Sequence, residues 1–174
     1  MNTRLSTASR AVVNACLSTA LWLTLPVGVL AQDQSVPAVD ALHAALNAAD
    51  VDRSSDLFAD DAVVIQPRIG GMPQIYVGQD QIRWWLRNLV AQHAQWTVDR
   101  PARVVDAGTI EWTDALSLDA FREIGLDSIE VKSDLVLAAD GRITALTTVL
   151  SPAAARSVQL APGDSAPGPF AAPT

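Results

Sequence analysis

The chain has 174 residues, of which 49% are hydrophobic and 18% are charged, and its formal net charge is −7 at pH 7. An acidic chain with few, scattered cations argues against nucleic acid and anionic membrane surfaces as partners, because both need clustered positive charge. With one cysteine and two histidines, the composition predicts no disulfide framework, no metal site and no cofactor.

Residues 1–31 are predicted to be a secretory signal peptide. A basic start with Arg4 and Arg10 is followed by a long apolar run, and Ala31 precedes the polar sequence QDQS. We expect cleavage after Ala31 and a secreted or periplasmic protein that keeps no membrane attachment. An uncleaved anchor is the alternative, since the apolar run is long enough to cross a bilayer. Cleavage would leave 10 basic and 19 acidic residues, hence a net charge of −9, and no cysteine.

The remaining chain has the length of one domain and a tail. Residues 32–152 carry regular hydrophobic patterns, and about 120 ordered residues are enough for one core. From residue 153 onward Ala, Pro, Gly and Ser dominate, so we expect residues 153–174 to form a disordered tail.

Helical spacing of apolar residues marks the first half of the domain. Residues 36–50 and 51–61 are predicted to be helices, followed by the short strand AVVIQP, which Pro67 ends. Residues 74–78 are predicted to be another short strand. Residues 79–93 give the strongest helix prediction, because their apolar side chains recur at intervals of three and four.

In the second half the pattern changes to alternation, which is typical of strands. Residues 96–108 and 109–117 are predicted to be neighbouring strands, and residues 117–127 a short helix with Ser117 as its N-cap. Residues 128–152 are predicted to be a β-hairpin that turns at an Asp-Gly pair.

Helices followed by strands, with one longer helix between them, predict an α+β domain. We expect a cone-shaped α+β barrel, in which a strongly curved, mostly antiparallel sheet wraps around the N-terminal and central helices. A polar group at the base of such a cone suits a small ligand.

Acid–base chemistry has few candidate residues in this sequence. His43 lies on the apolar stripe of the first predicted helix, where it is either a hydrogen-bonded histidine of the core or a general base. Asp114 lies near a strand end and is a candidate acid or base, and Glu111 is the second acid of that strand. In the hairpin, alternation places Ser133 on the inner face and the charged residues on the outer face.

The sequence resembles a known family over residues 36–152. The stretches ALNAADVDRSSDLFADDAVVIQP, YVGQDQIRWWL and DGRITALTTVLSP are similar to the SnoaL-like group of the nuclear transport factor two superfamily. That superfamily includes ketosteroid isomerases, polyketide cyclases and limonene epoxide hydrolases. The resemblance implies helices packed against a strongly bent sheet, a hydrophobic pocket and frequent homodimers, but it leaves the activity open.

The resemblance breaks at the functional positions of the ketosteroid isomerases. Those enzymes carry their proton-shuttling acid at the position of Gln66, and an amide does not titrate in the useful range. Their oxyanion site uses two tyrosines and a protonated acid, at positions held here by Leu42, Leu86 and Ser133. Steroid isomerisation by that mechanism is therefore not expected.

These observations favour a protein that binds a small, mostly hydrophobic ligand in its cone, with Gln66 and Ser133 as orienting polar groups. The predicted ligand-binding residues are Leu42, Val64, Gln66, Trp85, Leu86, Trp112, Ser133 and Leu135. The alternative is a cyclase-, isomerase- or epoxide hydrolase-like enzyme that uses His43 or Asp114. A third hypothesis is a structural role, in which the cone is packed shut and the outer face of the sheet forms a homodimer.

Overall fold

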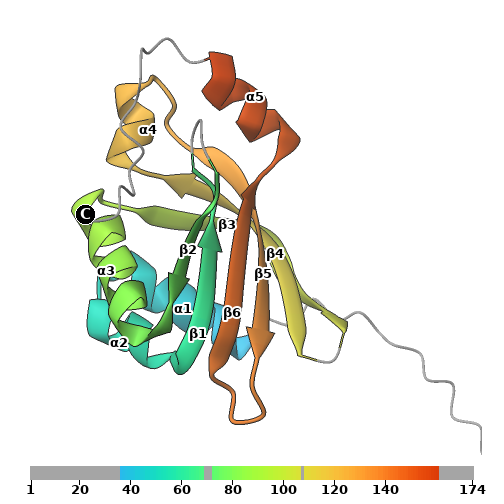
Figure 1. Cartoon of the computed structure of the whole chain (residues 1–174). Coiled ribbons are helices and arrows are strands. Elements are labelled where there is room, and N and C mark those ends of the chain that lie inside the picture. Colours follow the sequence, from blue (N-terminus) through green and yellow to red (C-terminus); the bar gives the residue numbers. More distant parts are fainter. Residues whose placement is uncertain (1–35, 69–71, 107, 161–174) are drawn as a thin grey trace, which may run out of the picture. The chain divides into compact units, whose positions relative to one another are not determined.

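The computed structural model describes residues 36–68, 72–106 and 108–160 (Figure 1). The predicted signal peptide lies outside these ranges. Within them the elements are α1 (Pro37–Asn47), α2 (Val51–Asp56), β1 (Phe58–Gln66), β2 (Gln74–Val77), α3 (Gly78–Ala91), β3 (Gln95–Asp106), β4 (Thr109–Ser117), α4 (Asp119–Glu123), β5 (Ile129–Leu137), β6 (Ile143–Leu150) and α5 (Pro152–Leu160). None of the helices in the described part is long and apolar enough to cross a membrane.

The six strands form one mixed sheet in the order β2-β1-β6-β5-β4-β3. Strands β1 and β6 are parallel, and the other neighbours are antiparallel. Helices α1, α2 and α3 lie on one side of the sheet in Figure 1. The predicted α+β fold is confirmed, but β2 and β3 remain edges, so the sheet is open and does not close into a barrel.

Helices α1 and α3 are held to the sheet by one apolar stripe each. Pro37 stands in the first turn of α1, where its missing N–H leaves no hydrogen bond unmade. The stripe of α1 is Val39, Leu42, His43, Ala45 and Leu46, and that of α3 is Ile82, Trp85, Leu86 and Leu89. His43 is the polar member, so the helix that builds the core also carries an imidazole into it.

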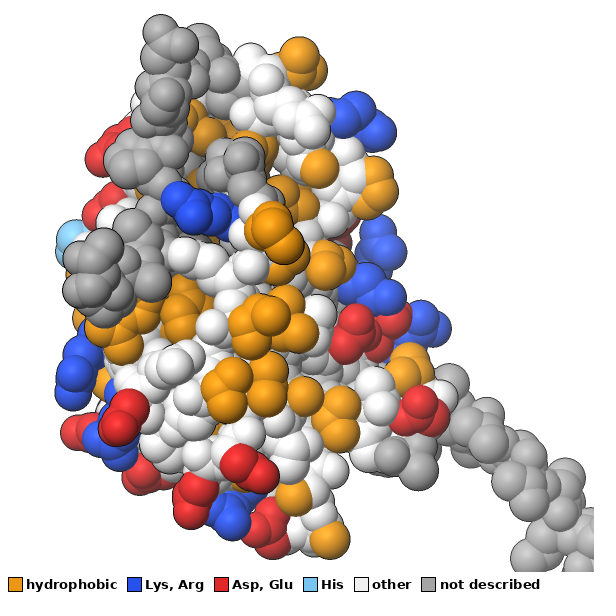
Figure 2. All heavy atoms as spheres, viewed as in Figure 1, with side chains coloured by type: hydrophobic (Ala, Val, Ile, Leu, Met, Phe, Trp, Pro, Cys, Tyr) orange, Lys and Arg blue, Asp and Glu red, His pale blue; other side chains and the backbone are white. Residues whose placement is uncertain are grey.

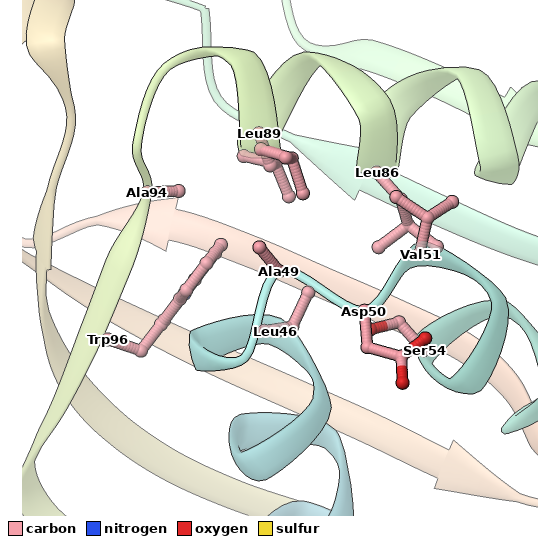
Figure 3. A pocket seen from close by; sticks show the side chains of 10 residues that line it. Leu46, Ala49, Asp50, Val51, Ser54, Leu86, Leu89, Ala94 and Trp96 are labelled. Atoms are coloured by element: carbon pink, nitrogen blue, oxygen red, sulfur yellow. The ribbon is translucent and has the colours of Figure 1, made fainter.

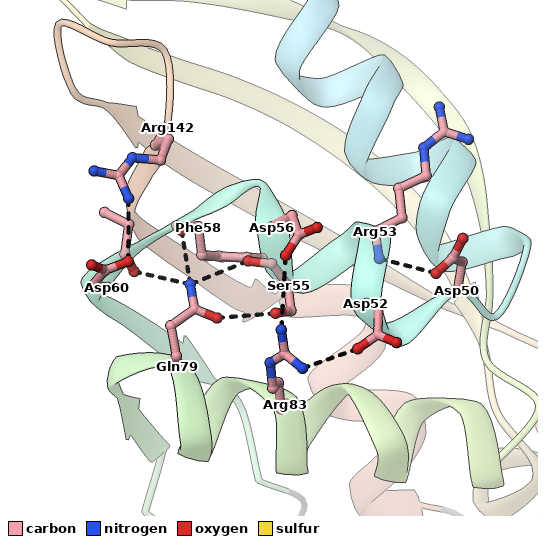
Figure 4. Close-up of polar contacts among 11 residues, drawn as sticks. Asp50, Asp52, Arg53, Ser55, Asp56, Phe58, Asp60, Gln79, Arg83 and Arg142 are labelled. Atoms are coloured by element: carbon pink, nitrogen blue, oxygen red, sulfur yellow. Dashed lines mark hydrogen bonds and ion pairs between the residues drawn. The ribbon is translucent and has the colours of Figure 1, made fainter.

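A polar cluster fixes the start of β1 between α2 and α3 (Figure 4). Gln79 donates from Nε2 to the carbonyl of Phe58 (2.9 Å), and its Oε1 accepts from the hydroxyl of Ser55 (3.0 Å). Arg83 of the same helix pairs with Asp52 of α2 at 3.0 Å. These contacts set the position of α3, and therefore of Trp85, over the sheet.

The chain's single tyrosine lies in an aromatic cluster between β2 and α3. The Tyr76 ring is stacked on Trp85, with centroids 6.2 Å apart, and is tilted against Trp84 at 5.9 Å. Its hydroxyl donates to Gln74 Oε1 at 2.9 Å. Burial disfavours the phenolate and raises the pKa of Tyr76 to about 12.

We therefore expect tyrosinate absorbance to appear with a midpoint near the Tyr76 pKa of about 12 in the folded protein. Because the native state keeps this proton to a higher pH than the unfolded chain, the free energy of unfolding should fall as pH rises above the ordinary value of 10.0. Absorbance and circular dichroism, followed together in one titration, check this. A midpoint at 10.0, with the fold still intact by circular dichroism, would contradict it.

The structure differs from the sequence prediction in three places. Residues 153–160, which were expected to belong to a disordered tail, lie in α5, because an alanine-rich segment begins at Pro152 and Ser151 Oγ accepts from the N–H of Ala154 (3.1 Å). Residues 161–174 of that tail lie outside the described ranges. Helix α4 begins one residue later than predicted, after Leu118 rather than Ser117. Residues 58–61 belong to β1 rather than to a helix, since Phe58 pairs with Ile143 of β6.

The outer face of the sheet carries exposed apolar side chains among its charges. Figure 2 shows hydrophobic side chains gathered over β1, β2 and β6. The exposed large residues on these strands are Ile75, Val77 and Val149. The predicted homodimer stays a prediction.

Candidate functional site

Four neighbouring strands place a row of side chains across the inner face of the sheet. The register pairs Trp112 of β4 with Ser133 of β5, and Ser133 with Thr148 of β6. Gln66, at the end of β1, donates from Nε2 to Thr148 Oγ1 (3.1 Å), and Thr148 Oγ1 lies 3.2 Å from Ser133 Oγ. The terminal amide of β1 is therefore part of a buried polar row rather than a free strand end.

A histidine and an aspartate meet beside this row. His43 of α1 lies with Nε2 3.0 Å from Asp114 Oδ2, and Trp112 Nε1 lies 2.5 Å from the same oxygen. Trp112 and Asp114 are two residues apart on β4, so both point to the inner face. Asp114 is 0% exposed and His43 is 8% exposed. The carboxyl group is thus buried with two nitrogen partners on one of its oxygens.

The partners of Asp114 Oδ2 indicate how the protons are placed. An indole nitrogen only donates, so Oδ2 accepts from Trp112 Nε1–H, and a carboxylate oxygen has a second lone pair for His43 Nε2–H. In that arrangement Nδ1 is the imidazole atom left to take up a proton. Nδ1 makes no hydrogen bond to another described residue.

His43, Asp114 and the polar row line one cavity, which we call the sheet cavity. Its polar lining is His43, Asp114, Gln66, Ser133 and Thr148, and the other lining residues are Leu42, Leu46, Leu146, Trp85, Trp96 and Trp112. The free space amounts to about 10 Å³, room for about one water molecule. Side chains thus fill most of the cavity, whose walls are mostly apolar with a few convergent polar groups.

A second small cavity lies next to it, between α1, α2 and α3 (Figure 3); we call it the helix cavity. Leu46 and Trp96 line both cavities, and so form the wall between them. Trp96 is only partly buried, and its backbone is held by Asn47, which accepts from Trp96 N (2.8 Å) and donates to Trp96 O (2.9 Å). The wall between the cavities therefore consists of side chains on a fixed backbone.

The structure brings most of the predicted site residues together. Those that line the sheet cavity are His43, Asp114, Leu42, Gln66, Trp85, Trp112 and Ser133. Val64 and Leu135 are instead fully buried core residues, and Leu86 lines the helix cavity. Glu111, the second acid of β4, points to the outer face, where hydrogen bonds from Lys132 and Arg103 lower its pKa.

Sequence reasoning missed Thr148, the residue that joins Gln66 to Ser133. Alternation along β6 offered a signal, because Leu146 and Thr148 share one face. Leu46 and Leu146 were also missed, since apolar core and apolar cavity wall look alike in sequence. No cluster of metal-binding side chains is found among the described residues.

Comparison with known families gives one match. A model of the SnoaL-like domain matches residues 39–146, more than half of the chain. No curated protein matches the sequence.

Several solved structures share the fold at low sequence identity. The epoxide hydrolase/cyclase-like enzyme SalBIII, described for pyran ring formation in the polyether salinomycin, is 15% identical with a TM-score of 0.56, over 68% of this chain and 91% of its own. A protein named as a polyketide cyclase from Sinorhizobium meliloti is 23% identical with a TM-score of 0.53, over 66% and 94%. An NTF2-like protein of unknown function from Cytophaga hutchinsonii is 13% identical with a TM-score of 0.51, over 69% and 94%. At these identities the likeness concerns the fold alone.

Proposed function

This chain belongs to the SnoaL-like domain family, and from that premise we propose that it is an acid–base enzyme acting on a small, mostly apolar molecule in the sheet cavity. The observation that carries the proposal is the buried pair of His43 and Asp114, at 3.0 Å, on the wall of that cavity. A titratable pair in a mostly apolar pocket is a typical arrangement for proton transfer.

The roles of the two residues follow from their hydrogen bonds. His43 takes a proton from the substrate on Nδ1 and later returns a proton, which has exchanged with solvent in the meantime. Asp114 holds the imidazole through Nε2 and stabilises the imidazolium while it exists. With a ketone substrate, the carbon–hydrogen bond next to the carbonyl breaks, its electron pair forms the enolate, and the proton moves to Nδ1. A positioned acid or base of this kind contributes roughly 10²–10⁴-fold to a rate.

Gln66 has a supporting role in this proposal. Its amide cannot act as a general base, and one of its N–H groups is already used by Thr148. It therefore orients the substrate together with Ser133 and Thr148, as one polar edge of an apolar cavity. Binding a molecule larger than water requires the side chains of Leu46 and Trp96 to move, which joins the sheet cavity to the helix cavity.

The proposal is tested by proton exchange, which needs no knowledge of the natural substrate. The mature protein is incubated in deuterium oxide with methyl isobutyl ketone, and the loss of the hydrogens next to the carbonyl is followed by NMR. Styrene oxide is included as an epoxide probe, because one structural neighbour is described as epoxide hydrolase-like. We expect exchange of the ketone above the buffer rate, and the loss of that exchange when His43 is replaced.

A second candidate function is ligand binding without catalysis. It is favoured by the nearly closed cavity and by the amide at position 66, where ketosteroid isomerases carry an acid. Binding of the ketone without exchange or ring opening at any pH would support this candidate and contradict the enzyme.

We also propose that the protein is exported and that residues 1–31 are removed. The basic start, the apolar run and the small residue at position 31 support this. Mass spectrometry of the protein from its native host should give an N-terminus at Gln32. A mature chain that retains Arg4 and Arg10 would indicate the uncleaved anchor instead.

A further inference from the structure

Two of the residues that line the sheet cavity each have a buried polar atom without a hydrogen-bond partner among the described residues. Trp85 Nε1 and Asp114 Oδ1 make no hydrogen bond to any other atom of the described residues. Trp85 is 1% exposed and Asp114 is 0% exposed, and both line the sheet cavity. Buried polar atoms are nearly always paired, so each such exception needs an explanation.

These two atoms have opposite hydrogen-bonding character. The indole N–H only donates, whereas a carboxylate oxygen accepts. The other oxygen of Asp114 is used by His43 and Trp112, and one N–H of the Gln66 amide donates to Thr148. Two residues that line the cavity therefore each carry one fully buried, unpaired polar atom: a donor on Trp85 and an acceptor on Asp114.

We propose that the sheet cavity recognises a hydroxy-carbonyl compound, whose carbonyl oxygen accepts from Trp85 Nε1–H and whose hydroxyl donates to Asp114 Oδ1. This inference rests on the proposed function, since it names the substrate class of the same site. The acidic side chain of Asp114 disfavours an anionic ligand. A cationic ligand pairs with Asp114 but offers no acceptor to Trp85, so a neutral molecule with both groups fits best.

This arrangement also places the substrate relative to the base. A hydroxyl bound to Asp114 Oδ1 is held by the same carboxyl group that holds His43 through Oδ2. The group that fixes the orientation of the imidazole therefore also fixes the substrate, and the carbonyl end is set by Trp85 on α3.

The test uses three probes with the same branched carbon skeleton. Diacetone alcohol has both groups, methyl isobutyl ketone lacks only the hydroxyl, and dimethyl propyl carbinol lacks only the carbonyl. Each is titrated into nitrogen-labelled mature protein, and the indole N–H signal of Trp85 is followed by NMR. The Trp85→Phe variant identifies that signal, and Trp84→Phe is the matched control on the neighbouring residue.

We expect diacetone alcohol to shift the Trp85 indole signal and to bind about tenfold more tightly than methyl isobutyl ketone, because the bond to a charged acceptor is lost in the latter. Removing the carbonyl should weaken binding about fivefold in the parent protein and in Trp84→Phe, and leave affinity unchanged in Trp85→Phe. An unmoved indole signal, equal affinity for all three probes, or no binding at saturating concentration would overturn the inference.

The outcomes separate this inference from the proposed function. If the probes bind as expected but no proton exchange occurs, recognition by Trp85 and Asp114 is supported and the proposed acid–base function is contradicted. If proton exchange depends on His43 but the Trp85 signal does not respond, the acid–base function is supported and recognition by Trp85 and Asp114 is contradicted.

Discussion

Replacing His43 with glutamine should lower the rate of ketone proton exchange by roughly 10²–10⁴-fold, while the domain stays folded. Glutamine is close in size and has an N–H that can still donate to Asp114. It has no group that takes up a proton in the working pH range, so the base is lost while the hydrogen bond is kept. Exchange followed by NMR, with circular dichroism as the check on folding, measures both parts of this expectation.

The other histidine provides the matched control for this experiment. His93 is exposed and lies with Nδ1 2.6 Å from Asp119, outside the sheet cavity. His93→Gln should therefore keep the parent rate, whereas His43→Gln should lose it. An unchanged rate in His43→Gln would show that the imidazole is not the base, and a loss in both variants would point to a general effect on the protein.

The inner face of the sheet was predictable from the sequence because strand alternation is a local property. Val131, Ser133 and Leu135 alternate with charged residues, and the structure places them inward as predicted. The same rule predicts that Trp112 and Asp114 share a face. The buried face of a strand can be predicted from the pattern of that strand alone, without knowing which strands lie beside it.

The contacts of the site were not predictable in this way. His43 and Asp114 are 71 positions apart, and their meeting depends on how α1 lies over β4. The bond from Gln66 to Thr148 depends likewise on the parallel pairing of β1 with β6, which no local pattern encodes. The sequence thus named most of the candidate residues, but only the register and the helix packing determine which of them touch.

The geometry moves the candidate acid–base group from position 66 to the pair of His43 and Asp114. The sequence comparison drew attention to Gln66, because ketosteroid isomerases have their base at that position. In this chain the buried acid lies instead on β4, paired with a histidine from α1. An amide at position 66 is therefore compatible with the proposed acid–base function, since β4 places another acid in the lining of the cavity.

Trp85 links the stability of the fold to the site. Its ring is 1% exposed and lies edge-on to Phe58, with centroids 6.3 Å apart, besides stacking on Tyr76. Trp85→Ala should lower the free energy of unfolding by about 3–5 kcal/mol, because truncating a fully buried aromatic leaves a cavity that the surrounding side chains only partly fill. Unfolding in urea, analysed for both the midpoint and the slope, measures this change.

The neighbouring Trp84 separates burial from aromatic contact in that experiment. Trp84 also lies against Tyr76, but it is only partly buried and lines neither cavity. Trp84→Ala should therefore cost about 1 kcal/mol, near the average for single substitutions. Equal losses in the two variants would mean that contact with Tyr76, rather than burial in the core, sets the stability. A larger loss of unfolding free energy in Trp85→Ala would mean that burial in the core sets the stability. Trp85→Phe keeps a buried ring and removes only the indole N–H, so it changes ligand recognition with less effect on the fold.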